Sequence, residues 1–190
     1  MTTPPTSQAS QPRPTTDNPD ELFDLVDEQD NVIGQVRRGD AHRNPALLHR
    51  SVQVMVFDSA GRLLLQRRSS RKDLFPGYYC ASASGHVIAG DDYQATAQRE
   101  LAEELGIAAP LTPLGHALVH SAVETEMTAL FLAQSDGPFH FDPVETAGGE
   151  LLTWQGALAG RATLPMTPAL LVALAALERL LATGALTLPL

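Results

Sequence analysis

The chain has 190 residues, of which 44% are hydrophobic, so it is long enough for one ordinary domain with a real core. The basic residues number 13 and the acidic residues 22, and the formal net charge of -9 disfavours nucleic acid or an anionic membrane surface as a partner. The single cysteine, Cys80, excludes an intramolecular disulfide and multi-cysteine zinc patterns; it suits a reducing compartment, and we expect a cytoplasmic protein.

The two ends of the chain differ in composition from its middle. Residues 1–18 are rich in Pro, Thr, Ser and Gln and have no apolar run, so they lack the core of a signal peptide and predict a disordered tail. The sequence therefore predicts one folded domain over residues 19–184, with a short C-terminal tail at residues 185–190.

The first half of the predicted domain reads as strands. Residues 21–36 indicate two short strands around an acidic turn. Residues 51–58 are β-branched and alternating, and the turn that follows them leads into the apolar residues 63–65, which is typical of a hairpin. Residues 72–85 contain Pro and Gly and predict a loop that leads into a short strand.

The second half continues this alternation. Residues 116–134 predict a strand pair, and residues 141–154 predict a loop and a strand that carries Trp154. Residues 166–184 predict a final helix with Thr167 as N-cap and Gly184 as its stop. Charged residues interrupt this helix before it reaches the roughly 20 apolar residues that a membrane span requires.

Between these halves lies an acidic helix. Helix-forming residues run from Gln94 to Leu105, Asp91 and Asp92 can cap the start, and Gly106 ends the helix. At helical spacing, Glu100, Glu103 and Glu104 crowd one face while two leucines share another.

Carboxylates that crowd one face repel one another unless a cation arrives. Arg99 can hold one of them in place, and a divalent metal can use the others. A solvated charged helix is the alternative interpretation of such a run.

The spacing of these residues resembles the Nudix box, G-x5-E-x7-R-E-U-x-E-E-x-G-U with U apolar. Asp91 stands where the family has Glu, and its shorter side chain weakens a bracing role for that position. The resemblance implies an α/β fold, an α/β/α sandwich with a mixed β-sheet, and hydrolysis of a diphosphate linkage with Mg²⁺, for which Mn²⁺ is a possible substitute. The other defined positions match: Gly85, Arg99, Glu100, Leu101, Glu103, Glu104, Gly106 and Ile107.

The Nudix resemblance also assigns roles. It implies that Glu100, Glu103 and Glu104 are metal-binding and catalytic, that Arg99 is their ion-pair partner, and that Gly85 is a backbone position near the metal. One carboxylate must act as general base, and Glu103 or Glu104 is the first candidate. Two acids in a later loop and strand are reserve candidates, or ordinary surface acids: Glu145 and Glu150.

A second resemblance extends over most of residues 20–182. The segments HRNPALLHR, SGH and ETEMTALF are similar to the isopentenyl diphosphate isomerase branch of the Nudix superfamily and its related hydrolases. In the isomerase, the matching positions bind a metal, which implies a possible second metal site. Alternatively, the histidines satisfy local hydrogen bonds, and the paired glutamates stand near the Nudix metals. The residues of this set are His42, His49, His86, Glu124 and Glu126.

The same branch implies the contacts to substrate. Arg38, Arg68 and Lys72 match positions that contact the diphosphate, although each could be a solvated surface charge. The non-phosphate end is left open, because aromatic residues beside Pro and Gly are equally suited to a core. The four aromatic candidates are Phe75, Tyr78, Tyr79 and Trp154.

Isomerisation is disfavoured by the residue before the box glycine. The isomerase has an acidic cysteine there, and this chain has Ser84, a far weaker acid. Cys80 lies four residues earlier, and we expect it to be a small buried hydrophobe that points elsewhere. The intact glutamate set favours a hydrolase; an isomerase and a non-catalytic diphosphate-binding module stay open. The expected partner is a small-molecule diphosphate, and the chain is expected to be a monomer or a homodimer.

Overall fold

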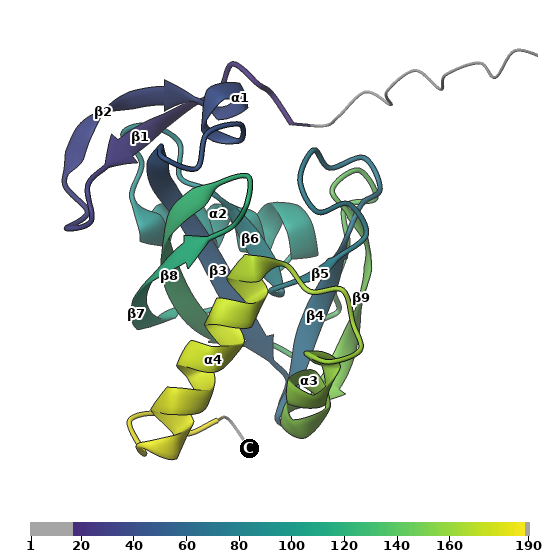
Figure 1. Cartoon of the computed structure of the whole chain (residues 1–190). Coiled ribbons are helices and arrows are strands. Elements are labelled where there is room, and N and C mark those ends of the chain that lie inside the picture. Colours follow the sequence, from purple (N-terminus) through teal and green to yellow (C-terminus); the bar gives the residue numbers. More distant parts are fainter. Residues whose placement is uncertain (1–16, 189–190) are drawn as a thin grey trace, which may run out of the picture.

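The computed structural model describes residues 17–188, so most of the predicted N-terminal tail and the last two residues lie outside the described part. Strands and helices alternate along the chain, as Figure 1 shows. The strands are β1 (Leu22–Val26), β2 (Val32–Arg37), β3 (Leu48–Phe57), β4 (Arg62–Arg68), β5 (Tyr79–Cys80), β6 (Ala83–His86), β7 (Thr112–His120), β8 (Thr125–Gln134) and β9 (Thr146–Thr153). The helices are α1 (Arg38–Ala41), α2 (Tyr93–Leu105), α3 (Trp154–Gly160) and α4 (Pro168–Ala182).

The sheet is mixed, which confirms the α/β prediction. Strand β3 is central: it pairs in parallel with β8 along its whole length and antiparallel with β6 and β1. Strands β4, β5 and β9 form the other side of the sheet. The two sides meet only where Phe57 pairs with Leu63, so β3 and β4 diverge from this point.

Helices cover both faces of the sheet. Figure 1 shows α2 behind the strands and α4 in front of them. The side chains of β3 alternate between the two layers: Val52, Val54 and Val56 pack with α2, while Met55 and Phe57 pack with α4. This arrangement is the α/β/α sandwich that the sequence predicts.

Local signals explain the two long helices. The Asp92 side chain accepts a hydrogen bond of 2.8 Å from the Ala95 amide and so begins α2. Gly106 ends α2 in the left-handed region, at φ 66°, where a residue without Cβ is favoured. Thr167 caps α4 in the same way as Asp92 caps α2, by accepting a bond from Leu170.

Trp154 corrects one expectation. It does not lie on a strand but is the first residue of α3, a helix that the sequence analysis missed. The reason is a cap: the Thr153 hydroxyl accepts a hydrogen bond of 3.1 Å from the Gly156 amide and turns the chain out of β9. The indole then packs against Phe57 in the core, with 6.5 Å between ring centroids.

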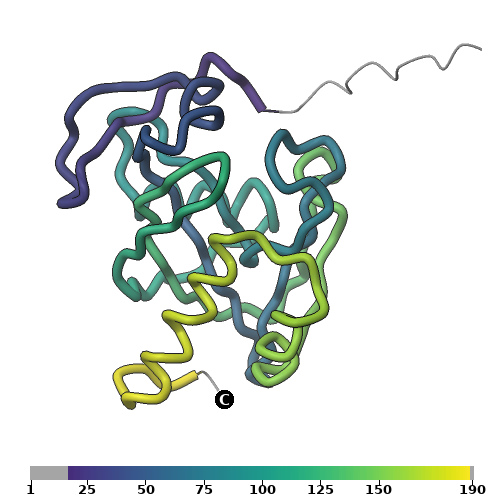
Figure 2. The backbone as a smooth tube through the Cα atoms, viewed as in Figure 1, coloured from purple at the N-terminus to yellow at the C-terminus, as the bar shows by residue number. Residues whose placement is uncertain are grey.

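Two loops lie side by side beyond the point where β3 and β4 diverge. Figure 2 shows the loop after β4, residues 69–78, beside the segment that leads into β9. The Ser69 amide donates a hydrogen bond of 3.0 Å to the Glu145 carbonyl, which joins the two.

Membrane-spanning character is lacking in the described helices. Within residues 17–188, none is both long enough and apolar enough to cross a bilayer.

Candidate active site

A cavity of about 390 Å³ opens where β3 and β4 diverge. It brings together residues that are distant in the chain, from Asp17 to Ala169, and its wall includes residues of β3, β4, β6, α2 and the segment before β8. Of the predicted site residues, only His49 is not in its wall. The others are Arg38, His42, Arg68, Lys72, Gly85, His86, Arg99, Glu100, Glu103, Glu104, Glu124 and Glu126.

The three carboxylates of α2, which we call the helix carboxylates (Glu100, Glu103 and Glu104), differ in burial. Glu100 and Glu104 are 8% and 7% exposed, whereas the Glu103 side chain is 59% exposed. Arg99 joins two of them, at 2.9 Å from Glu100 and 3.1 Å from Glu103. On this face of α2, two of the acids are therefore buried, and the third, Glu103, is exposed to solvent.

Two polar neighbours hold Glu104 in place. Its Oε2 accepts hydrogen bonds from the Ser84 amide at 3.0 Å and from Gln66 Nε2 at 3.1 Å. Gln66 was not singled out from the sequence, because a glutamine in an apolar strand carries no motif. Its hydrogen bond to Glu104 forms only because the fold places β4 opposite α2.

Burial makes the two buried helix carboxylates, Glu100 and Glu104, poor anions in the absence of a cation. Burial and then the neighbouring Glu104 charge raise the pKa of Glu100 to about 8. Burial also raises the pKa of Glu104 to about 7, against the lowering effect of the Ser84 amide. Two buried acidic groups with raised pKa values, facing one cavity, have the chemistry of a site for a divalent cation.

Gly85 allows the helix to approach the sheet. A Cβ at this position would lie 2.2 Å from Glu100 Oε1, far inside van der Waals contact. The box glycine is thus required by the position of a carboxylate, and not by an unusual backbone conformation.

Asp91 stands apart from this arrangement. Among residues 17–188, no ion pair within 4.0 Å connects it to Arg99. Burial lowers the pKa of the Arg99 guanidinium, but Glu100 and Glu103 outweigh that effect and raise the pKa, and the Asp91 charge adds a smaller effect in the same direction. Asp92 rather than Asp91 supplies the helix cap.

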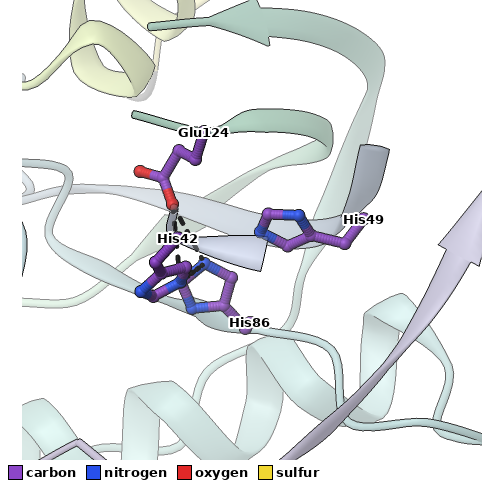
Figure 3. A group of neighbouring side chains, drawn as sticks. All are labelled: His42, His49, His86 and Glu124. Carbon is purple, nitrogen blue, oxygen red and sulfur yellow. Dashed lines mark hydrogen bonds and ion pairs between the residues drawn. The ribbon is translucent and has the colours of Figure 1, made fainter. Parts of the chain in front are cut away.

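The second predicted ligand set also converges. We call His42, His49, His86, Glu124 and Glu126 the histidine cluster. One ligand atom from each of the first four lies within 4.8 Å of the others. Figure 3 shows the Glu124 carboxylate directed at the rings of His42 and His86, with Oε2 at 3.5 and 3.7 Å from the two Nε2 atoms.

Glu126 completes the cluster. Its Oε1 lies 3.4 Å from His86 Nε2. Burial raises its pKa, but the hydrogen bond with His86, the charges of His86 and His49 and a hydrogen bond with Ser51 together outweigh that effect and lower the pKa to about 2. Burial and then the Glu126 charge raise the pKa of Glu124 to about 7 instead. Near neutral pH, Glu126 is thus held ionised, whereas Glu124 binds a proton much more readily.

Two atoms of the histidine cluster lack hydrogen-bond partners among the described residues. His49 Nε2 and Glu124 Oε2 are buried without one among the described residues, and His42 Nε2 faces His86 Nε2 at 3.3 Å. Burial and then His86 lower the pKa of His49 to about 4, so its ring is a neutral donor of a lone pair. An unpaired imidazole nitrogen, together with two further imidazoles beside carboxylates, fits a divalent metal that accepts both ligand types.

The predicted cations line the cavity but are already engaged. Arg38 is 8% exposed and pairs with Asp17 at 2.9 Å. Lys72 contacts the same aspartate, and its Nζ lies 2.6 Å from Glu145. These residues are therefore not solvated surface charges. Arg68 donates to the Leu74 carbonyl at 3.1 Å, which holds its guanidinium at the cavity wall.

Cys80 corrects a second expectation. It is buried, as predicted, but it lines the same cavity as Ser84 instead of pointing elsewhere. The reason is that β5 pairs with β4, which sets the thiol 3.2 Å from Gln66 Oε1. Burial raises the pKa of Cys80 to about 11, so the thiol is a weaker acid than a free cysteine.

The reserve acids and the aromatic candidates are scattered. Glu145 lines the cavity beside Lys72, whereas Glu150 accepts a hydrogen bond of 2.6 Å from the Tyr79 hydroxyl. Of the four aromatic residues, only Phe75 lies in the cavity wall.

Comparison with known proteins decides the family. The family model described as the NUDIX domain matches residues 47–169. The chain belongs to the Nudix family. The match spans β3 to the start of α4, and so covers most of the cavity.

Relatives of this Nudix protein carry two kinds of name. It is 38% identical over 152 residues to a Nocardia farcinica protein named isopentenyl-diphosphate Delta-isomerase, covering 77% of this chain and 85% of the relative. It is 41% identical over 126 residues to a Yersinia pestis protein named an uncharacterized Nudix hydrolase, covering 66% and 69%. A crystal structure of a Deinococcus radiodurans protein superposes with a TM-score of 0.68 at 30% identity, covering 80% of this chain and 97% of the other.

Proposed function

We propose that this Nudix protein is a Mg²⁺-dependent hydrolase that cleaves a diphosphate linkage in a nucleoside diphosphate or another organic diphosphate. The observation that carries the proposal is the pair of buried carboxylates, Glu100 and Glu104, in the same cavity as Arg68 and Lys72. Acids for a metal and cations for phosphate oxygens are the two requirements of diphosphate hydrolysis.

The helix carboxylates fit the hard cation better than the histidine cluster does. They offer only oxygen ligands, which Mg²⁺ prefers. When bound, Mg²⁺ lowers the pKa of water and neutralises the charge of the diphosphate. Glu100, Glu103 and Glu104 would hold the ion, and Arg99 would keep Glu100 and Glu103 in position through its two ion pairs.

The chain's other residues would bind and orient the substrate. Arg38, Arg68 and Lys72 would hold diphosphate oxygens, which offsets the negative charge of the protein as a whole. Glu103 or Glu104 would accept the proton of the attacking water. Glu103 is the more exposed of the two, while the Ser84 amide and Gln66 already occupy one oxygen of Glu104.

Hydrolysis across a panel of diphosphates tests the proposal. The panel contains nucleoside diphosphates and triphosphates, dinucleotides, nucleotide sugars, coenzyme A and isopentenyl diphosphate, each with Mg²⁺ or Mn²⁺. We expect phosphate release from at least one class and its loss in Glu104→Gln. Absence of turnover from folded, metal-binding protein would remove the main support for a hydrolase.

An isomerase is the second candidate, because the Nocardia farcinica relative bears that name and the histidine cluster is present. Ser84 and the raised pKa of Cys80 argue against it, since neither side chain is a ready proton donor. Conversion of isopentenyl to dimethylallyl diphosphate by the wild-type protein would establish this candidate instead.

A non-catalytic module that binds diphosphates is the third candidate. Ligand affinity without turnover under any divalent metal would support it. Under each candidate we propose a cytoplasmic protein, as the single cysteine suggests, that acts as a monomer or a homodimer on a small molecule.

A further inference from the structure

Gln53 lies in the cavity wall next to the histidine cluster. Side chains alternate along β3, so His49, Ser51 and Gln53 point to the same face of the sheet. Strand β6 pairs Ser51 with His86 and Gln53 with Ser84. Gln53 therefore lies beside Ser84, two residues further along β3 than the residue that pairs with His86.

The Gln53 carboxamide is left without a donor. The residue is 5% exposed, and its Oε1 has no hydrogen-bond partner among the described residues. Its polar neighbours are engaged with other groups: Ser51 shares a bond of 2.8 Å with Thr128, and the Ser84 amide donates to Glu104. A buried carbonyl oxygen without a donor destabilises the folded state, so a donor within the cavity, on a water or on a substrate, would stabilise this side chain.

Neither a diphosphate nor a hydrocarbon can supply that donor. Phosphate oxygens are acceptors at neutral pH, and alkyl groups form no ordinary hydrogen bonds. We infer that Gln53 accepts a hydrogen bond from a hydroxyl or amine on the organic part of the substrate. The substrates are then diphosphates of polar, donor-bearing groups and not of plain hydrocarbons. This inference rests on the proposed hydrolase function, since it specifies the substrate class of that site.

Substitution of Gln53 by methionine tests the inference, because methionine has a similar length and lacks the carbonyl acceptor. Values of kcat/KM are measured for pentyl diphosphate, its terminal hydroxyl derivative, and ribonucleoside and sugar diphosphates. We expect the wild type to prefer donor-bearing substrates, and Gln53→Met to reduce that preference about tenfold or more. Gln35→Met, at an exposed glutamine of β2, is the matched control and should keep the preference.

Three results would overturn the inference. A wild type that prefers the plain alkyl substrate contradicts it directly. An equal loss on every substrate in both Gln53→Met and Gln53→Glu would mean that the amide nitrogen donates to a phosphate. Weaker Mg²⁺ or Mn²⁺ binding by Gln53→Met in calorimetry would make Gln53 a metal ligand. By contrast, Gln53→Glu keeps an acceptor and should keep the preference.

Binding separates this inference from the proposed function. Methylene-bridged analogues of the alkyl and hydroxyalkyl diphosphates cannot be hydrolysed, and their affinities are measured for the wild type and Gln53→Met. If no substrate turns over but the hydroxyl analogue binds more tightly in a Gln53-dependent way, the hydrolase proposal fails and the inference holds. If a substrate turns over but the alkyl and hydroxyalkyl analogues bind equally, the hydrolase proposal holds and the inference about Gln53 fails.

A different observation concerns Asp17. Its carboxylate lies 2.9 Å from Arg38 Nη2, also contacts Lys72 Nζ, and accepts a hydrogen bond of 3.1 Å from the Asp73 amide. The side chain is only 5% exposed and lies in the cavity wall. An anion thus sits between two of the three cations that are candidates for holding the diphosphate.

We propose that Asp17 occupies a phosphate position and competes with the substrate for Arg38 and Lys72. A carboxylate and a phosphate oxygen make the same charge-assisted bonds to these groups, so both cannot hold the cations at once. The residue lies at the N-terminal edge of the described chain, and its release would free both cations together. This proposal depends on those cations as the diphosphate site, and not on Gln53.

Asp17→Asn tests the competition, with Asp20→Asn as the control. Asp20 belongs to the same segment but pairs at 2.6 Å with Arg37, away from the cavity, and both side chains are largely exposed. Calorimetry with inorganic pyrophosphate and Mg²⁺ should show several-fold tighter binding to Asp17→Asn and no change for Asp20→Asn. Equal or weaker binding by Asp17→Asn, in protein that melts like the wild type, would show that Asp17 only scaffolds the cations.

Discussion

The helix carboxylates and the histidine cluster share one cavity but are assembled in opposite ways. The first group comes from one helix, within five residues of sequence, and offers only oxygen atoms. The second comes from the end of α1, from β3, from β6, from the segment entering β8 and from β8 itself, and offers nitrogen and oxygen together. The two groups are therefore expected to differ in the metal that they prefer.

Burial acts on the two groups differently. Each buried member of the helix carboxylates has a raised pKa, because the effect of burial outweighs the lowering effects of nearby cations such as Lys72. The histidine cluster contains its own counter-charges, so Glu126 has a lowered pKa while Glu124 has a raised one. The helix carboxylates thus depend more on an added cation than the histidine cluster does.

The largest effect is expected from the helix carboxylates. Glu104→Gln keeps the size of the side chain and an acceptor for Ser84 but removes a charge that we propose binds the metal. We expect kcat/KM to fall on the order of 10³-fold in the steady-state assay. Glu178→Gln, at an exposed ion pair with Arg161, should leave activity within about twofold. Similar losses in both variants would place catalysis elsewhere.

Gly85→Ala should have the next largest effect. The new Cβ would force Glu100 away from its position, since 2.2 Å separates that Cβ from Oε1. We expect a loss of roughly tenfold to 100-fold in kcat/KM, with retained fold by circular dichroism. Gly34→Ala has room in the β1–β2 hairpin, where the nearest atom is 4.0 Å away, and is the control. Unchanged activity in Gly85→Ala would show that the position of Glu100 is not critical.

His49→Ala distinguishes the two groups by metal. We expect the affinity for Mn²⁺ or Zn²⁺ at the histidine cluster to fall about tenfold or more, because one imidazole ligand is removed. Mg²⁺ binding at the helix carboxylates should change less. Titration calorimetry of each metal checks this, and an equal effect on both metals would mean that the groups act as one site.

The smallest effect concerns stability and pH. The folded-state pKa values of about 8 for Glu100 and about 7 for Glu104 lie above the ordinary value of 4.5. Without metal, the folded protein therefore holds protons that the unfolded chain releases, and stability falls as pH rises from about 5 to about 8. With a chelator present, the Tm of Glu104→Gln should fall by a few degrees less over this pH range than the Tm of the wild type. Parallel melting curves would contradict the raised pKa.

His49 should act in the opposite sense over a lower range. Its folded-state pKa of about 4 lies below the ordinary 6.5, so its contribution to stability is present above pH 6.5 and is lost as pH falls toward 4. His49→Ala should lack this loss when Tm is measured in chelator between those limits. A wild-type slope in the variant would assign the acid loss to other groups.

The sequence predicted those parts of the site that local spacing determines. The α2 cap, the glycine at its end and the order of the helix carboxylates follow from residues close together in the chain. Their unequal burial does not follow, because it depends on β4 and β6 lying against one end of the helix. Helical spacing alone does not indicate which of Glu103 and Glu104 is buried.

The features that were missed depend on contacts between distant residues. Cys80 faces the cavity because β5 pairs with β4, and Gln53 is short of a donor because its neighbours bond elsewhere. Asp17 lies in a segment whose composition predicts no structure, yet two cations distant in sequence surround it. Trp154 was misplaced because a single hydroxyl decided where β9 ends.

The single pairing between β3 and β4, Phe57 with Leu63, has a consequence for how such a protein diversifies. Beyond that pair, the two walls of the cavity belong to separate hydrogen-bonded ladders. Side chains and loops on one wall can be exchanged without disturbing the backbone of the other. If the protein is the proposed hydrolase, selectivity for the organic group and the chemistry on phosphorus can thus evolve at different rates in the same fold.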